Sequence, residues 1–182
     1  MQETIHLLHT NDLHSHFENW PRITRQLAAR KAHWRLAAGT HTVLTFDIGD
    51  AMDRAHPLTE ATNGQANVAM LNKVGYDAAT IGNNEGIGNS PHVLRHLYDQ
   101  ANFPVVLGNL FSDRTTQKLA PFAVDHVLLH SAGGTRILVL GYTAPFLTTY
   151  HANGWYPELI GEVLPRQLHA FAGQYAFCIL LS

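Results

Sequence analysis

Three apolar segments in the first 110 residues each run directly into a short polar cluster, and this pattern limits the possible folds more than any other feature. The segments and the clusters that follow them are residues 5–8 before 9–14, 42–46 before 47–50, and 77–81 before 82–86. Short apolar runs bounded by turn residues are typical of buried strands. Helical patterns separate the three runs, and this alternation of strand and helix favours an α/β domain.

The remaining pattern adds further elements and a change of topology. Helices are expected at 20–36, 65–74, 90–98 and 162–171, with Pro21 and Ser90-Pro91 as start signals and Gly75 as a stop. Residues 104–107 predict a fourth strand, and a Gly-Gly turn at 133–134 predicts a hairpin of 124–129 with 137–141. Residues 176–181 predict a last apolar strand. These elements together predict one α/β domain with a mixed sheet or sheets.

Composition excludes several classes of protein. The chain has 182 residues, 46% of them hydrophobic and 14% charged, with a formal net charge of −2. This charge balance gives no basic footprint for nucleic acid. No stretch approaches the roughly 20 apolar residues that span a bilayer, and the first residues lack the features of a signal peptide. We therefore expect a cytoplasmic protein with neither a membrane nor a nucleic acid as partner.

The polar clusters carry residues that suit a divalent cation. Asp12 and His14 stand two apart, so in extended backbone their side chains point to the same side, and a carboxylate with an imidazole is a good ligand pair. Asp50 can bridge two cations, and Asn83 offers a neutral carbonyl oxygen. Open α/β sheets bind ligands beyond the carboxyl ends of their strands, where these loops are expected to meet. Asp and Asn are also ordinary turn residues, so each cluster alone is weak evidence.

Taken together, the three clusters resemble those of the calcineurin-like metallophosphoesterases. The resemblance rests on His9-Thr10-Asn11-Asp12-Leu13-His14, on Asp47-Ile48-Gly49-Asp50 and on Gly82-Asn83-Asn84-Glu85. It is strongest to the bacterial 5′-nucleotidase family, which includes 2′,3′-cyclic-nucleotide phosphodiesterases. The resemblance implies a four-layer α/β/β/α sandwich with mixed sheets and two divalent metal ions (Mn, Zn, Fe or Mg). Asp12 and His14 would bind one ion, Asp50 would bridge both and Asn83 would bind the second. Phosphate esters, above all nucleotides, are the implied substrates.

The chain departs from the family pattern in two ways. Asn84 stands where the family motif has a histidine, so the candidate catalytic residue can donate a hydrogen bond to a phosphoryl oxygen but cannot deliver a proton. The family's Gly-His-x-His pair does not occur. We therefore expect residues 1–182 to be the N-terminal part of the catalytic domain, incomplete at its C-terminus and without the C-terminal substrate-binding domain. Such a chain would bind at most one cation and be inactive or weakly active.

Three further expectations concern neighbouring residues and alternatives. Glu85 is expected to orient its own loop, and Asp47 to act through hydrogen bonds in its turn, rather than bind metal. The apolar strand at 176–181 would leave an uncovered edge, which predicts possible self-association. The alternative to an enzyme is a non-catalytic binding or structural domain with a degenerate metal site.

Overall fold

The three apolar segments form one parallel sheet. In the computed structural model, which describes residues 2–182, β1 (Glu3–Thr10) pairs with β2 (Thr40–Asp47), and β2 pairs with β3 (Ala78–Ala79). Because the strands are parallel, their carboxyl ends lie at one end of the sheet. The polar clusters that follow them therefore start side by side.

A second sheet is mixed, as the sequence predicts. The hairpin of β6 (Val127–His130) and β7 (Arg136–Gly141) is antiparallel, and β9 (Phe177–Leu181) pairs with β7 in parallel. Alternate residues of β7 face opposite sides: Ile137 and Val139 pack with β2, while Leu138 and Leu140 pack with α7 (Ile160–Ala170). The two-residue period of a strand thus lets one strand serve two cores.

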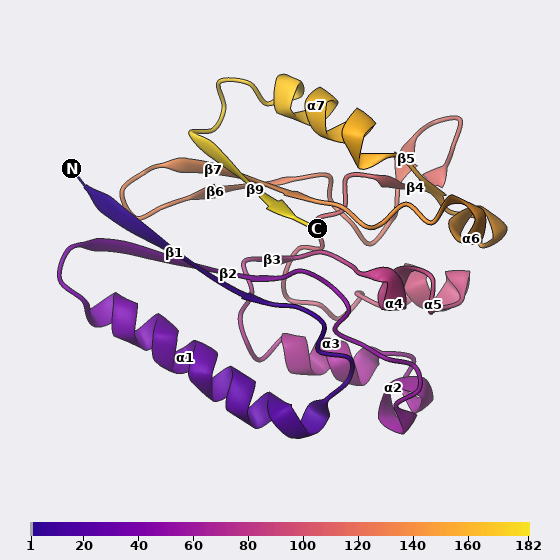
Figure 1. Cartoon of the computed structure of the whole chain (residues 1–182), viewed down its shortest axis with the longest axis horizontal. Coiled ribbons are helices and arrows are strands. Elements are labelled where there is room, and N and C mark those ends of the chain that lie inside the picture. The colour runs from indigo at the N-terminus through magenta and orange to yellow at the C-terminus, as the bar shows by residue number, and fades with distance from the viewer. Residues whose placement is uncertain (1) are drawn as a thin grey trace.

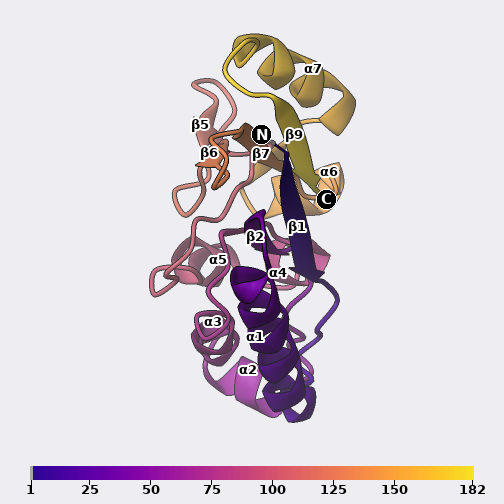
Figure 2. The ribbon, with the colours of Figure 1, turned by 90° about the vertical axis from the view of Figure 1, so that its left-hand side faces the viewer.

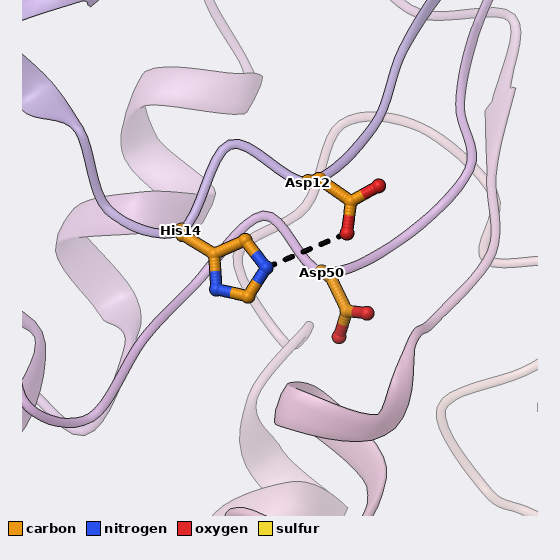
Figure 3. Close-up of side chains that lie close together, drawn as sticks. All are labelled: Asp12, His14 and Asp50. Carbon is orange, nitrogen blue, oxygen red and sulfur yellow. Dashed lines mark ion pairs between the residues drawn. The ribbon is translucent and has the colours of Figure 1, made fainter.

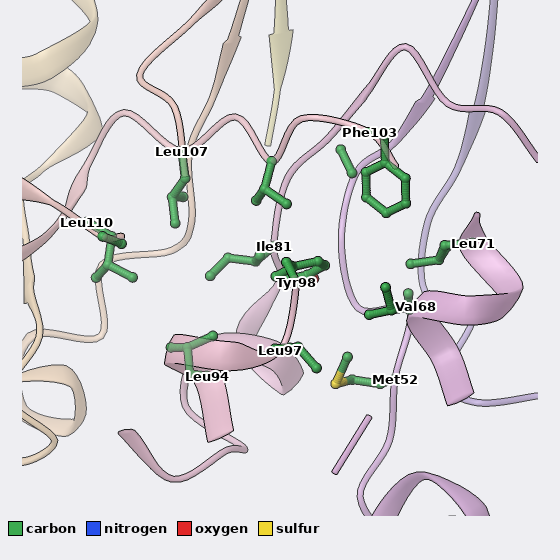
Figure 4. Close-up of a cluster of buried hydrophobic side chains, with 14 of the residues drawn as sticks. Met52, Val68, Leu71, Ile81, Leu94, Leu97, Tyr98, Phe103, Leu107 and Leu110 are labelled. Atoms are coloured by element: carbon green, nitrogen blue, oxygen red, sulfur yellow. The ribbon is translucent and has the colours of Figure 1, made fainter. Parts of the chain in front are cut away.

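The elements stack as helix, sheet, sheet, helix (Figure 1). Helix α1 (Trp20–Leu36) covers the outer face of the first sheet, and α7 covers the outer face of the second. The largest buried cluster lies between the first sheet and its helices (Figure 4). This arrangement confirms the predicted four-layer fold class. The shorter helices are η1 (Phe17–Asn19), α2 (Pro57–Ala61), α3 (Gln65–Leu71), α4 (Asn83–Gly86), α5 (Pro91–His96) and α6 (Leu147–Ala152).

One predicted strand was wrong, and one small sheet was missed. Residues 104–107 form no regular strand, because Val105 bridges Ala79 while Val106 bridges Val124, and neither bridge extends into a ladder. A small antiparallel sheet was not predicted; it has the order β5 (Lys118–Leu119), β4 (Leu110–Asp113), β8 (Tyr156–Pro157). Two of its strands have only two residues each, which is too short for a period in the sequence to be visible.

Strands β1 and β9 are edge strands on the same side of the two sheets (Figure 2). Ile5 of β1 packs in the same cluster as Leu181 of β9, while Leu7 and Leu180 are 50% and 43% exposed. Self-association through β9 stays a prediction. Among residues 2–182 there is no helix with the length and apolar character needed to cross a bilayer.

Candidate metal centre

Three of the predicted ligands converge at the carboxyl end of the first sheet (Figure 3). Asp12, His14 and Asp50 each offer a ligand atom, and these atoms all lie within 4.8 Å of one another. Nε2 of His14 lies 3.4 Å from Oδ1 of Asp12. Within residues 2–182 this is the only group of three or more His, Cys, Asp or Glu side chains that meets this spacing. Two carboxylates with one imidazole suit a hard or borderline divalent cation.

The backbone brings these side chains together in a different way from the one the sequence predicts. Asp12, His14 and Asp50 have φ values of 51°, 43° and 53°, so they are left-handed rather than extended. The prediction that the side chains converge is right, but its reason, the alternation of an extended strand, was wrong. Left-handed backbone costs a non-glycine residue about 1–3 kcal/mol and clusters at functional sites. The surrounding structure must therefore hold these loops in place.

The first two loops hold each other through backbone hydrogen bonds. The N–H groups of Asp12, His14 and Ser15 donate to the carbonyls of Gly49, Asp50 and Ala51 at 3.0–3.1 Å. This series continues the pairing of β1 with β2 beyond the ends of the strands. The ligand residues of one loop thus keep a fixed register against the ligand residue of the other.

The buried side chain of Glu85 joins the second loop to the third. Its Oε2 accepts from the N–H groups of Asp50 and Gly82 at 3.0 and 2.8 Å, and its Oε1 accepts from the N–H of Met52 at 3.0 Å. Burial, reinforced by the charge of Asp50, raises the pKa of Glu85. The prediction that Glu85 orients its loop is confirmed, and it orients the neighbouring loop as well.

Glycine is required where these two loops cross. A Cβ on Gly49 would collide with the backbone of Gly82, and a Cβ on Gly82 would collide with the carboxylate of Asp50. The two glycines therefore allow the Asp50 loop to approach the strand that leads to Asn83.

Asp47 is buried and holds the ends of two strands through hydrogen bonds. It accepts hydrogen bonds from the Thr10 hydroxyl at 2.5 Å and from the Gly49 N–H at 3.1 Å, as predicted for a residue of this turn. Tyr76 Oη lies 2.6 Å from the same Thr10 hydroxyl. Burial raises the pKa of Asp47 to about 7, against the opposing effect of the Thr10 hydrogen bond. A titratable carboxyl therefore ties the end of β1 to the end of β2.

A buried polar network around Ser15 was missed by sequence reasoning. The Ser15 hydroxyl lies 2.7 Å from the Thr59 hydroxyl, and it accepts from the Asn67 side chain at 3.0 Å and from the Asp53 N–H at 2.7 Å. Ser15, Thr59 and Asn67 are all buried. This network attaches the loop that carries Asp12 and His14 to helices α2 and α3. No local signal in the sequence connects residues so far apart.

Asn83 and Asn84 start helix α4 next to Asp50. The Asn83 amide lies 3.2 Å from Asp50 Oδ2; its hydrogen bonds are satisfied when its nitrogen donates to that carboxylate and its oxygen accepts from the Asn84 N–H. The Asn84 N–H donates to Asp50 Oδ1 at 2.8 Å. Asp12, Asp50 and Asn83 also line one cleft. The four predicted ligands thus lie together, while their metal binding and the catalytic role of Asn84 stay predictions.

Relatives in sequence identify the family of the chain. The metallophosphoesterase YunD of Bacillus subtilis, itself uncharacterized, is 41% identical over all 182 residues. A 5′-nucleotidase of Vibrio parahaemolyticus is 31% identical over 163 residues, which is 86% of this chain and 27% of the relative. The chain belongs to the 5′-nucleotidase-like metallophosphoesterases. It corresponds to their N-terminal part and spans 38% of the length of YunD.

The fold of the chain is also found in solved structures. The structure of the NAD nucleotidase of Haemophilus influenzae matches 97% of this chain with a TM-score of 0.80, over 33% of its own length. At 18% sequence identity this match shows the fold alone. No family model matches the chain. The structural match therefore shows the fold, and the relatives in sequence show the family.

Proposed function

We propose that this metallophosphoesterase chain contributes the first set of metal ligands to an enzyme that hydrolyses phosphate esters of nucleotides. The observation that carries the proposal is the convergence of Asp12, His14 and Asp50 within 4.8 Å. The 5′-nucleotidase relatives support nucleotides as the substrate class.

The proposed roles follow from position. Asp12 and His14 would hold one cation, Asn83 would help to hold a second, and Asp50, which lies near all three residues, would contribute its carboxylate to both. To act as a ligand, Asn83 would turn its amide oxygen toward the cation, the reverse of the orientation that its hydrogen bonds to Asp50 and Asn84 favour. Divalent cations held in this way lower the pKa of a bound water and neutralise charge on phosphoryl oxygens. Mn, Zn, Fe or Mg would all accept this mixed donor set.

The ligand count limits what the chain does alone. Asp12, His14, Asn83 and a bridging Asp50 make five bonds, whereas two four-coordinate cations need about eight. We therefore expect one cation to bind, weakly, and hydrolysis to be very slow. A version of the protein extended to the length of its relatives is expected to be active.

Calorimetry with Zn²⁺ and Mn²⁺, together with phosphate release from an aryl phosphate and from nucleotides, tests the proposal. The Asp50→Asn substitution should abolish cation binding. Asp99→Asn is the matched control, because Asp99 forms an exposed ion pair with His96 at 2.9 Å and has no third ligand. Equal binding by both variants would overturn the metal site. Cation binding without phosphate release in the extended protein would favour a non-catalytic domain.

A further inference from the structure

Helix α1 concentrates positive charge in a chain whose formal net charge is −2. Its 17 residues include five of the 12 Lys and Arg of the chain and none of the 14 Asp and Glu. The five cations are Arg22, Arg25, Arg30, Lys31 and Arg35. At a rise of about 1.5 Å per residue they extend over about 20 Å along a helix on the outside of the molecule (Figure 1). A run of like charge of this length favours an extended anion over a single small one.

Three of these cations have no partner within the protein. Arg22, Arg25 and Arg30 are exposed, and among residues 2–182 their guanidinium groups form no ion pair or hydrogen bond. The other two cations of α1 lie close enough to Asp77 to favour its charged form. A guanidinium without a partner keeps all of its N–H donors available for an anion from outside the chain.

The three arginines line a surface groove along α1. One depression is bounded by Arg22, Arg25 and Arg30 around the small side chain of Ala29. A second depression extends from Arg22 to His9 at the end of β1. Because the two depressions share Arg22, they form one groove. A guanidinium binds a carboxylate through two parallel hydrogen bonds, so carboxylates suit this lining.

The exposed side of α1 lacks the features that two other anionic partners require. Single-stranded nucleic acid stacks its bases on aromatic rings, but Trp20 is buried and Trp34 stacks on His6. A helix that lies in a membrane surface needs an apolar face toward the lipid. Ile23 instead packs on the core, and Leu36, which is 88% exposed, is the only large apolar residue of α1 that faces mainly solvent. A peptide rich in carboxylates requires neither feature.

We propose that the exposed side of α1 around Arg22, Arg25 and Arg30 is a docking surface for an acidic peptide segment of a partner protein. Successive arginines are separated by about 4.5 and 7.5 Å along the helix axis. Alternate side chains of an extended peptide share one side and are spaced by about 6.6 Å, which matches this range. The inference does not rest on the proposed function, because no residue of the metal centre takes part in it.

Binding of a fluorescein-labelled polyglutamate peptide, measured by fluorescence anisotropy, tests the proposal. The unchanged chain should bind the peptide more weakly as salt rises, because salt screens exposed charges. The triple variant Arg22→Gln, Arg25→Gln, Arg30→Gln should bind at least about tenfold more weakly, the combined effect of three exposed ion pairs. Glutamine has nearly the helix propensity of arginine, so circular dichroism should show that the helix is retained.

A second triple variant is the matched control. Arg114→Gln, Lys118→Gln and Arg136→Gln change the net charge by the same amount at exposed residues outside α1, and this variant should bind the peptide like the unchanged chain. If the first variant fails to fold, Arg25→Gln alone replaces it and should weaken binding about twofold or more.

Three results would overturn the proposal. Absence of peptide binding by the unchanged chain would show that the surface does not dock acidic segments. Equal losses in the two triple variants would show that net charge, and not α1, attracts the peptide. Tighter binding of a thymidine oligonucleotide or of phosphatidylserine vesicles than of the peptide would assign the surface to nucleic acid or to a membrane instead.

Discussion

Histidines lie toward both ends of the parallel sheet, but their ring nitrogens contact different partners. At the carboxyl end, His14 lies with the carboxylates of Asp12 and Asp50. Toward the amino end, His6 of β1 and His41 of β2 lie against Trp34 of α1. The His6 ring stacks on the indole with centroids 3.8 Å apart.

In the second group, hydrogen bonds join His6 to His41 and His41 to a backbone carbonyl. His41 Nε2 lies 2.8 Å from the Ala38 carbonyl, which can only accept, so this nitrogen carries a proton. In the neutral ring His41 Nδ1 is then an acceptor, and His6 Nε2 donates to it at 3.0 Å. Burial and the neighbouring His41 lower the pKa of His6, which keeps its ring neutral.

A cluster of histidines is therefore not sufficient to form a metal site. Around His14, buried groups such as Glu85 hold the backbone, so that the imidazole and two carboxylates converge on one point. Around His6 the rings pack and hydrogen-bond to one another, so that the Nδ1 lone pair of His41 is already used. A metal centre here depends on the groups behind the ligands as much as on the ligands.

Removing the buried carboxylate of Glu85 should have the largest effect on zinc binding and stability. Glu85→Leu leaves the N–H groups of Asp50, Gly82 and Met52 without an acceptor, at about 1–3 kcal/mol each. We expect zinc binding to be lost and the free energy of unfolding to fall by several kcal/mol, measured by calorimetry and urea unfolding.

A milder substitution keeps this prediction open to contradiction if Glu85→Leu fails to fold. Glu85→Gln retains one acceptor oxygen and should fold with weakened zinc binding. Glu162→Gln, in the first turn of α7, is the matched control and should change neither quantity. Normal zinc affinity in folded Glu85→Gln would show that the loops keep their shape without this carboxylate.

The ligand residues could be predicted from the sequence, whereas the buried Ser15 network that holds one of their loops could not. Asp12, His14, Asp50 and Asn83 were found because each follows an apolar strand, and parallel strands bring such positions together. The alternation of strand and helix predicted the α/β class, and the resemblance to the family implied the four layers. Both signals are local, so both can be recognised in a single sequence.

Long-range packing decided the rest. The left-handed backbone of Asp12 and His14 depends on hydrogen bonds to residues 49–51. The role of Ser15 depends on Thr59 and Asn67, which approach it only in the folded state. Neither feature has a pattern in the residues next to it, so single-sequence reasoning could not find it.

Asp47 should give an intermediate, pH-dependent effect. Its folded pKa of about 7 lies above the usual 3.8, so between about pH 4 and 7 the unfolded chain has lost a proton that the folded chain keeps. Stability from this group is therefore present below pH 4 and declines as pH rises to 7, by about 4 kcal/mol at most at about 1.4 kcal/mol per unit.

Asp47→Asn tests this linkage, because the amide has no proton to lose. The unfolding free energy of the variant minus that of the unchanged chain should rise from pH 4 to 7 and then stay constant. Urea unfolding at several pH values measures it, and subtraction cancels the other titrating groups. A difference that is flat across this range would show that Asp47 is ionised in the folded protein at pH 4.

The smallest effect is expected at the histidines of the amino end. His41→Gln removes one hydrogen bond to His6 and part of the contact with Trp34, so stability should fall by about 1 kcal/mol. Zinc affinity should stay within about twofold, because each lone pair lost was already used inside the group, whereas His14→Gln should abolish binding. Calorimetric titration of both variants compares the two ends of the sheet directly. Equal losses of zinc affinity would mean that His6 and His41 also bind the ion. The proposed difference between the two ends of the sheet would then be wrong.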